Sequence, residues 1–136
     1  MKTLIGAVAV VLCWPFLAVL AADPKVDLSK LPPPSEQKGL TYAKDIRPIF
    51  ERHCFNCHDP EKHKGKLRLD SLEATLKGGE DGKVLEPGKS AQSMLIRKVA
   101  HLAADEEDWM PPQGKAEALT KEQVALIRAW IDQGAK

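Results

Sequence analysis

Two thiols and an imidazole stand close together in the segment HCFNCH, which covers residues 53–58 of the 136-residue chain. Cys54 and Cys57 are three positions apart, and His58 directly follows the second cysteine. Four kinds of site begin with this spacing: a disulfide, a redox-active dithiol, a metal site and an anchor for covalently bound haem. The remaining residues discriminate between these four.

Three of these interpretations fit the sequence poorly. A redox dithiol of the thioredoxin type would need strands around it, and no segment alternates apolar and polar residues as a half-buried strand does. A zinc site needs four ligands. His53 or His63 could supply the fourth, but no second Cys/His pair follows at zinc-finger spacing. A plain disulfide leaves His58 without a role.

Covalent haem attachment uses all three residues. In the Cys-x-x-Cys-His pattern, the two thiols are joined to the haem vinyl groups as thioethers, and the adjacent histidine ligates the iron from one face. The pattern therefore predicts one covalently attached haem c per chain, held by Cys54 and Cys57, with His58 as the first axial ligand of the iron.

A second axial ligand must come from elsewhere in the chain. The candidates are His53, His63, His101, Met94 and Met110. We favour Met110, because it precedes Pro111-Pro112 and a residue before proline is restricted to extended backbone, so that this loop can hold a thioether rigidly. Met94 is expected in the core, on the apolar side of a helix. Ligation by His63 or His101 is the main alternative to Met110.

The elements that must position these residues are predicted to be helices. Residues 42–54 carry Ile46, Ile49 and Phe50 at the spacing of one buried helical face. Pro48 must lie in the first turn of this helix or kink it, because proline has no N–H for the helical ladder.

The clearest helix lies near the C-terminus. Thr120 and Gln123 are predicted to form a capping box at its start, and Gly134 stands where it should stop. Its apolar stripe consists of Val124, Ile127, Trp130 and Ile131.

Two shorter helices are expected between these two. One covers residues 72–77 with Asp70 as its N-cap, and the other begins at Ser90. Long loops at residues 78–87 and 102–119 separate the helices, and loops of this length in a compact domain are usually functional. The predicted fold class is all-α.

The N-terminal region is predicted to direct export. Residues 1–21 resemble a secretory signal peptide, with Lys2 before an apolar stretch and small residues at its end. Residues 22–39 contain three consecutive prolines and are interpreted as an extended tether. Residues 40–136 form the predicted domain. We expect a periplasmic or otherwise exported protein, attached to a membrane only if the signal segment is retained as an anchor.

Charge and composition narrow the function further. The formal net charge of +1 includes Lys2, so the chain after cleavage is close to neutral, which argues against a nucleic-acid binder. Seven aromatic residues (three Trp, three Phe and one Tyr) make a thin core that a bulky cofactor would fill. A basic run at residues 62–68 and an acidic run at residues 105–108 are interpreted as solvated faces or as docking rims.

With these features in place, the chain resembles a class I c-type cytochrome, and more narrowly the single-haem cytochrome c modules of planctomycetes. The resemblance covers residues 42–135. It rests on the stretches DIRPIFERHCFNCH, KGKLRLDS, LKGGEDGKVLEPGKS and MPP and on the closing Trp-Ile-x-x-Gly-Ala.

The resemblance implies a small cytochrome c fold, with several helices wrapped around one haem. The first and last helices would cross, so that Ile46 and Phe50 pack against the apolar stripe of the last helix. Leu67 and Leu69 would line the haem pocket, and the segment GGEDGKVLEPG would pass over the haem.

The function predicted from the sequence is single-electron transfer between redox partner proteins by an exported monohaem cytochrome that is not an enzyme. Its His58/Met110 ligation would leave no position for a substrate. The alternatives are a haem subunit of a larger oxidoreductase and a haem enzyme or gas sensor with an open sixth position. Relatives in the narrower group are commonly modules of larger chains, whereas this chain ends soon after its last helix. We therefore expect its redox partner to be a separate protein.

Overall fold

The structure is a computed structural model that describes residues 26–136. The predicted signal peptide, residues 1–21, lies outside the described residues, as does the start of the predicted linker. Within residues 26–136, no helix is both long and apolar enough to cross a membrane.

Helices and loops make up the described part of the chain, which contains no β-strand, and the all-α prediction is thus confirmed. The α-helices are α1 (Arg47–His53), α2 (Phe55–His58), α3 (Leu72–Lys77), α4 (Met94–Val99) and α5 (Lys121–Asp132). A π-helical turn, Tyr42–Ile46, leads into α1, and 3-10 turns cover Leu28–Lys30, Lys64–Lys66, Ser90–Gln92 and Glu106–Asp108. Pro48 lies in the first turn of α1, where it interrupts no helical hydrogen bond.

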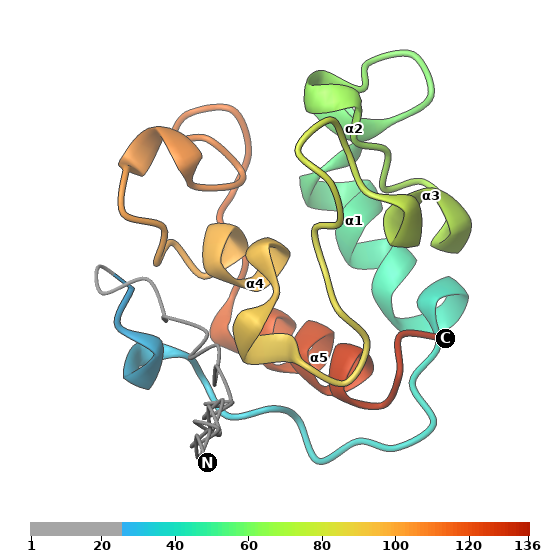
Figure 1. Cartoon of the computed structure of the whole chain (residues 1–136), viewed down its shortest axis with the longest axis vertical. Helices are drawn as coiled ribbons and strands as arrows, with labels where there is room; N and C mark the ends of the chain where they lie inside the picture. The colour runs from blue at the N-terminus through green and yellow to red at the C-terminus, as the bar shows by residue number, and fades with distance from the viewer. Residues whose placement is uncertain (1–25) are drawn as a thin grey trace, which may run out of the picture.

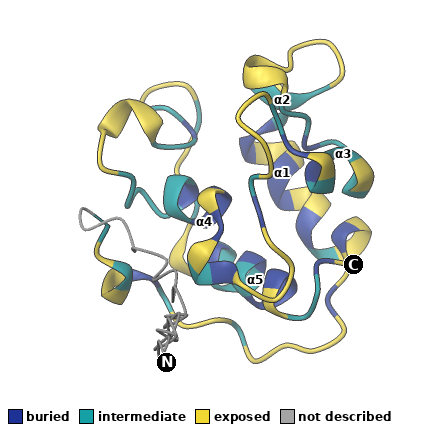
Figure 2. Cartoon of the chain, in the orientation of Figure 1, coloured by how far each residue is buried: buried dark blue, intermediate teal, exposed yellow. Residues whose placement is uncertain are grey.

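The core lies where the segment leading into α1 meets α5, and Figure 2 shows the buried faces of these elements turned inward. The ring of Trp130 lies 6.1 Å from that of Tyr42, which in turn lies 6.2 Å from Phe50. Ile46, Phe50, Ile127, Trp130 and Ile131 are completely buried in this cluster. The structure thus brings together the two sets of apolar residues that the resemblance placed in contact.

Helix α5 begins and ends at the predicted residues. The hydroxyl of Thr120 accepts a hydrogen bond from the backbone N–H of Gln123 (3.2 Å), and the side chain of Gln123 accepts one from the N–H of Thr120 (2.9 Å). Gly134 follows the helix with a φ of +102°, a backbone conformation that favours glycine.

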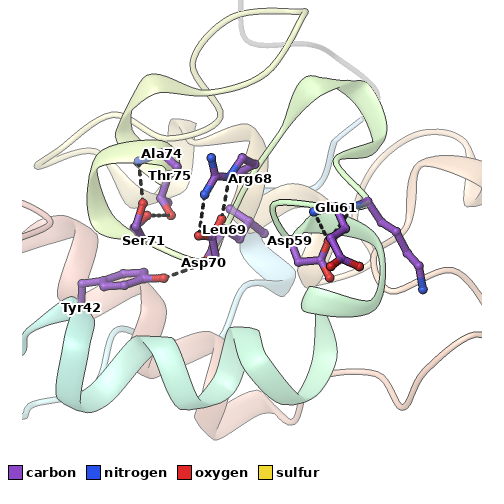
Figure 3. A network of polar contacts seen from close by, with 10 residues as sticks. Tyr42, Asp59, Glu61, Arg68, Leu69, Asp70, Ser71, Ala74 and Thr75 are labelled. Atoms are coloured by element: carbon purple, nitrogen blue, oxygen red, sulfur yellow. Dashed lines mark hydrogen bonds and ion pairs between the residues drawn. The ribbon is translucent and has the colours of Figure 1, made fainter.

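The predicted caps of the two short helices are wrong. Ser71 caps α3, with its hydroxyl accepting from the N–H of Ala74 at 3.2 Å. Asp70 instead accepts two hydrogen bonds from the guanidinium of Arg68, at 2.9 and 2.8 Å (Figure 3). Ser90 begins a 3-10 turn before α4 and donates its hydroxyl to the carboxylate of Asp132 at 2.9 Å. Asp70 is thus bound by a guanidinium two residues before it, and Ser90 by a carboxylate 42 residues away in the sequence.

The described part of the segment interpreted as an extended tether packs on the domain. Figure 1 shows this segment passing along α5. The N–H of Ser35 donates to the carbonyl of Ala125 at 3.0 Å, and the side-chain amide of Gln133 donates to the carbonyl of Gln37 at 2.7 Å. The guanidinium of Arg128 donates to the carbonyl of Pro32. Extended backbone leaves its carbonyls free to accept such bonds, which is why this segment can dock without forming a helix.

Candidate haem-binding site

A cavity of about 440 Å³ brings Cys54, Cys57, His58 and Met110 together. The first three come from the end of α1 and from α2, and Met110 comes from the loop that precedes α5. Apolar side chains form much of the remaining wall, among them Leu67, Leu69, Val84, Leu95, Val99 and Pro111. The cavity therefore combines sulfur and nitrogen donors with largely apolar walls.

The imidazole of His58 is held in one tautomer. Its Nδ1 lies 3.1 Å from the carbonyl oxygen of Leu67, and because a carbonyl only accepts, Nδ1 must carry the proton. Nε2 is then left with a free lone pair. Burial lowers the pKa of His58, although its hydrogen bond to Leu67 acts in the opposite direction. A neutral imidazole with a bare Nε2 is the form that ligates a metal.

The two thiols lie on a tight turn at the end of α1. The carbonyl of Cys54 accepts hydrogen bonds from the N–H groups of both Cys57 and His58, each at 3.0 Å. Both thiols are free; Cys54 is buried and Cys57 is half-buried. Burial, with a smaller contribution from Cys57, raises the pKa of the Cys54 thiol to about 12.

Met110 is fixed by its backbone at the cavity. Its N–H donates to the carbonyl of Lys98 in α4 at 3.1 Å, and the indole of the preceding Trp109 donates to the carbonyl of Ala103 at 3.1 Å. The Met110–Pro111 peptide bond is cis.

Met94 was predicted to be a core residue, and this prediction is wrong. Its side chain is 38% exposed and lines the same cavity as Met110. Met94 stands at the first position of α4, and it lines the cavity together with Leu95 and Val99 of the same helix. The cavity thus contains a second thioether, from a residue that the sequence offered as a candidate ligand but placed in the core.

The three histidines that could replace Met110 as the second axial ligand lie in different surroundings. His63 is exposed and does not line the cavity. His101 stacks on the ring of Trp109, with a centroid distance of 4.9 Å, and lines a smaller cavity of about 130 Å³. His53 reaches the large cavity, but its Nδ1 lies 2.8 Å from the carbonyl of Glu117 and its Nε2 lies 3.2 Å from the amide nitrogen of Gln123. Both of its ring nitrogens are therefore engaged.

Glycines let the loop after α3 form one wall of the cavity. A Cβ at Gly79 would lie 2.5 Å from the carbonyl oxygen of Gly65, and one at Gly78 would collide with the backbone of Gly82. The N–H of Glu80 donates to the Gly65 carbonyl at 2.8 Å, which ties the loop to the segment that follows α2. This is the segment that the resemblance placed over a haem.

Tyr42 supports the wall beside His58 from the core. Its hydroxyl donates to the buried carbonyl of Leu69 at 2.6 Å, as Figure 3 shows. The N–H of Leu69 in turn donates to the carbonyl of His58 at 2.8 Å. One chain of hydrogen bonds therefore runs from the core to the backbone of the predicted axial ligand.

The titration of Tyr42 is expected to report this buried contact. Burial raises its pKa to about 12 from its ordinary value of about 10. As the pH rises, the tyrosine of the unfolded chain ionises before that of the folded protein. The free energy of unfolding that Tyr42 contributes should therefore be fully present below pH 10 and should fall as the pH rises toward 12. Tyr42 is the chain's one tyrosine, so tyrosinate absorbance measures it directly. Ionisation of the folded protein near pH 10, as in the denatured control, would show that the hydroxyl is not buried.

The donor set fits a haem c. Two thiols, an imidazole with a free Nε2 and a thioether line one largely apolar cavity. Within residues 26–136, no group of three or more His, Cys, Asp and Glu side chains is arranged to hold a metal ion by itself.

An all-α fold with this cavity is consistent with a small c-type cytochrome domain. Residues 54–114 match the family Planctomycete cytochrome C, which confirms the resemblance that the sequence indicated. The matched range begins at Cys54 and includes Cys57, His58 and Met110. Proteins of the matched family carry haem c, and the matched range includes all four residues predicted to hold it.

One curated relative is the hydrazine synthase subunit alpha of Kuenenia stuttgartiensis, which is 28% identical over 127 residues. The match covers 74% of this chain but 16% of the relative, so the chain corresponds to a small part of that protein. A solved structure of Kuenenia stuttgartiensis hydrazine synthase also matches, with a TM-score of 0.48 and 23% identity over 71% of this chain and 16% of that one.

Proposed function

We propose that this chain binds one haem c covalently through Cys54 and Cys57, and that it carries single electrons between redox partner proteins outside the cytoplasm. His58 and Met110 would be the axial ligands of the iron. The observation that carries the proposal is the convergence of these four side chains on one apolar cavity, although Met110 comes from a distant loop. Bound haem supplies reversible one-electron chemistry.

The residues around the cavity suit a carrier better than an enzyme. The carbonyl of Leu67 orients His58 with Nε2 free to ligate, and the soft sulfur of Met110 favours ferrous iron and raises the potential. His58 and Met110 would both ligate the iron and would leave no position for a substrate. The proposal therefore excludes activation of oxygen or peroxide at the iron.

Covalent attachment and one-electron exchange test this proposal together. The protein is produced with its N-terminal segment in cells that attach haem to exported proteins. The expected result is a haem that stays with the chain on a denaturing gel and titrates as one one-electron couple. The double variant Cys54→Ser/Cys57→Ser should lose the haem on the gel. A haem that dissociates from the wild-type chain, or no redox transition, would contradict the proposal.

The charged residues at the cavity favour electrostatic docking of partners. Lys64 and Lys115 line it together with Glu80 and Asp81, and all four are exposed or partly exposed. The exposed basic run at residues 62–66 continues from Lys64. Charged rims of this kind steer fast, weak encounters.

Electron exchange with the anionic probe hexacyanoferrate should slow several-fold as ionic strength rises. The reason is that the screening length falls from about 30 Å at 0.01 M to about 3 Å at 1 M. Stopped-flow mixing measures the rate. Lys64→Gln should weaken the dependence of the rate on salt. Lys30 lines the other cavity, so Lys30→Gln is the control and should leave this dependence unchanged. Rates independent of salt would remove the docking role of the basic run.

A fixed haem subunit is a second candidate, because the matched relative is a subunit of a larger enzyme. Tagged protein isolated from its own cells would then co-purify with a partner at constant stoichiometry. A mobile carrier would be recovered alone.

A further inference from the structure

We propose that His53 is a positioning residue that holds the Met110 loop against the haem-attachment segment. This inference rests on the proposed role of Met110 as an axial ligand. It concerns a residue that precedes Cys54 directly but is bonded to parts of the chain far away in sequence.

The loop that carries Met110 has few attachments. Residues 111–119 form no helix, and the backbone hydrogen bond within them joins the N–H of Lys115 to the carbonyl of Pro112 at 3.0 Å. At the start of the loop, the N–H of Met110 is bonded to the carbonyl of Lys98. Beyond Met110, the hydrogen bonds from the loop to other described elements all go to Arg52 and His53 at the end of α1.

Of these two attachments, the one through His53 is buried. The Arg52–Glu117 ion pair spans 3.4 Å with both side chains more than 70% exposed, so that solvent and salt weaken it. His53 is 6% exposed, and its Nδ1 lies 2.8 Å from the carbonyl of Glu117. The buried hydrogen bond of the loop is therefore the one with His53, and Leu119 beyond it packs against the core.

The neighbours of His53 determine its tautomer. Because the N–H of Thr120 donates to the Oε1 of Gln123 at 2.9 Å, the amide nitrogen of Gln123 is the atom that faces His53. That nitrogen donates, so the Nε2 of His53 must accept, and Nδ1 carries the proton given to the Glu117 carbonyl. One neutral imidazole therefore joins the end of α1, the Met110 loop and the start of α5.

The arrangement links the two halves of the site. Cys54, the residue after His53, is predicted to hold the haem, and the loop that ends at Glu117 carries the predicted distal ligand. Without the imidazole, the segment between Met110 and Leu119 loses its buried hydrogen bond to the end of α1 and can move away from it. The expected consequence is local opening over the cavity, while the core around Trp130 stays folded.

Two conservative variants of the haem-loaded protein separate the bonds of His53. The amide of His53→Asn can reach the place of Nδ1 and keep the loop bond, whereas His53→Gln places its amide near Nε2 and loses it. The Asn variant should keep the weak far-red band of ferric methionine ligation. The Gln variant should lose much of it and bind carbon monoxide in the ferrous form about ten times faster, with unchanged far-UV circular dichroism.

Ile127→Val is the matched control, because this residue is fully buried in the core and does not line the cavity. In a denaturant titration of the control, the far-red band and the far-UV circular dichroism signal should be lost at the same denaturant concentration. In His53→Gln, the band should be lost at a lower concentration than the helical signal. If His53→Gln does not fold, Gln123→Leu should weaken the band as well, because it removes the amide that fixes the tautomer in which Nδ1 donates to Glu117. If the band and the helical signal of His53→Gln were lost together and its carbon monoxide binding were unchanged, the positioning role of His53 would be overturned, but not the ligand role of Met110. A wild-type protein without the band would instead overturn the ligand role of Met110.

Discussion

The variant Met110→Ala is expected to retain covalently attached haem and to leave the sixth position of the iron open. Alanine removes the thioether, whereas Cys54, Cys57 and His58 stay in place at the end of α1 and in α2. The ferric far-red band should disappear, the ferrous form should bind carbon monoxide, and the reduction potential should fall because methionine favours ferrous iron. Visible spectra and a potentiometric titration measure all three effects.

Met94→Ala is the matched control for this experiment. Met94 lines the same cavity with the same kind of side chain, but it stands at the start of α4 rather than in the proline-stiffened loop. It should leave the band and the potential almost unchanged. An unchanged ferric spectrum in Met110→Ala would mean that Met110 is not the ligand, and loss of the band in Met94→Ala would assign that role to Met94.

The second large effect concerns the core. Trp130→Ala should lower the free energy of unfolding by about 3–5 kcal/mol, the usual cost of removing a large buried aromatic side chain. Trp130 is completely buried beside Tyr42, and its indole donates to the carbonyl of Lys136 at 2.9 Å. Since small domains have about 5–15 kcal/mol of stability in total, this loss should leave the variant marginal. Denaturant unfolding followed by far-UV circular dichroism measures it.

Leu126→Ala on the same helix provides the comparison. Leu126 is only partly buried, so the variant leaves a smaller cavity and should cost clearly less. If Trp130→Ala were no more destabilising than Leu126→Ala, the contact between α5 and the start of α1 would not be the centre of the core.

Local signals explain the parts of the fold that the sequence predicts well. The capping box of Thr120 and Gln123 involves residues three positions apart, and Gly134 supplies the backbone conformation that ends the helix. The haem-attachment pattern is equally local, because Cys54, Cys57 and His58 lie on one short turn. Such features depend little on the rest of the chain, so they can be predicted without a structure.

The incorrect predictions depend on partners that the capping patterns do not specify. Asp70 is bound by its near neighbour Arg68, whereas Ser90 is bound by Asp132, which lies far along the chain. The role of His53 depends on Glu117 and Gln123, which no local pattern connects to it. Its position directly before Cys54 is the one sequence signal that could have drawn attention to it. Likewise, the predicted linker docks on α5 through the side chains of Arg128 and Gln133.

The visible spectrum of the protein, exported from cells that attach haem and recorded in the ferric and ferrous forms, is the measurement to make first. We expect the spectrum of a thioether-linked haem, with the weak far-red ferric band of methionine ligation. Haem without that band, together with carbon monoxide binding, would contradict Met110 ligation and favour an enzyme or a sensor. A protein that carries no haem would contradict the proposed function itself and return Cys54, Cys57 and His58 to disulfide or metal chemistry.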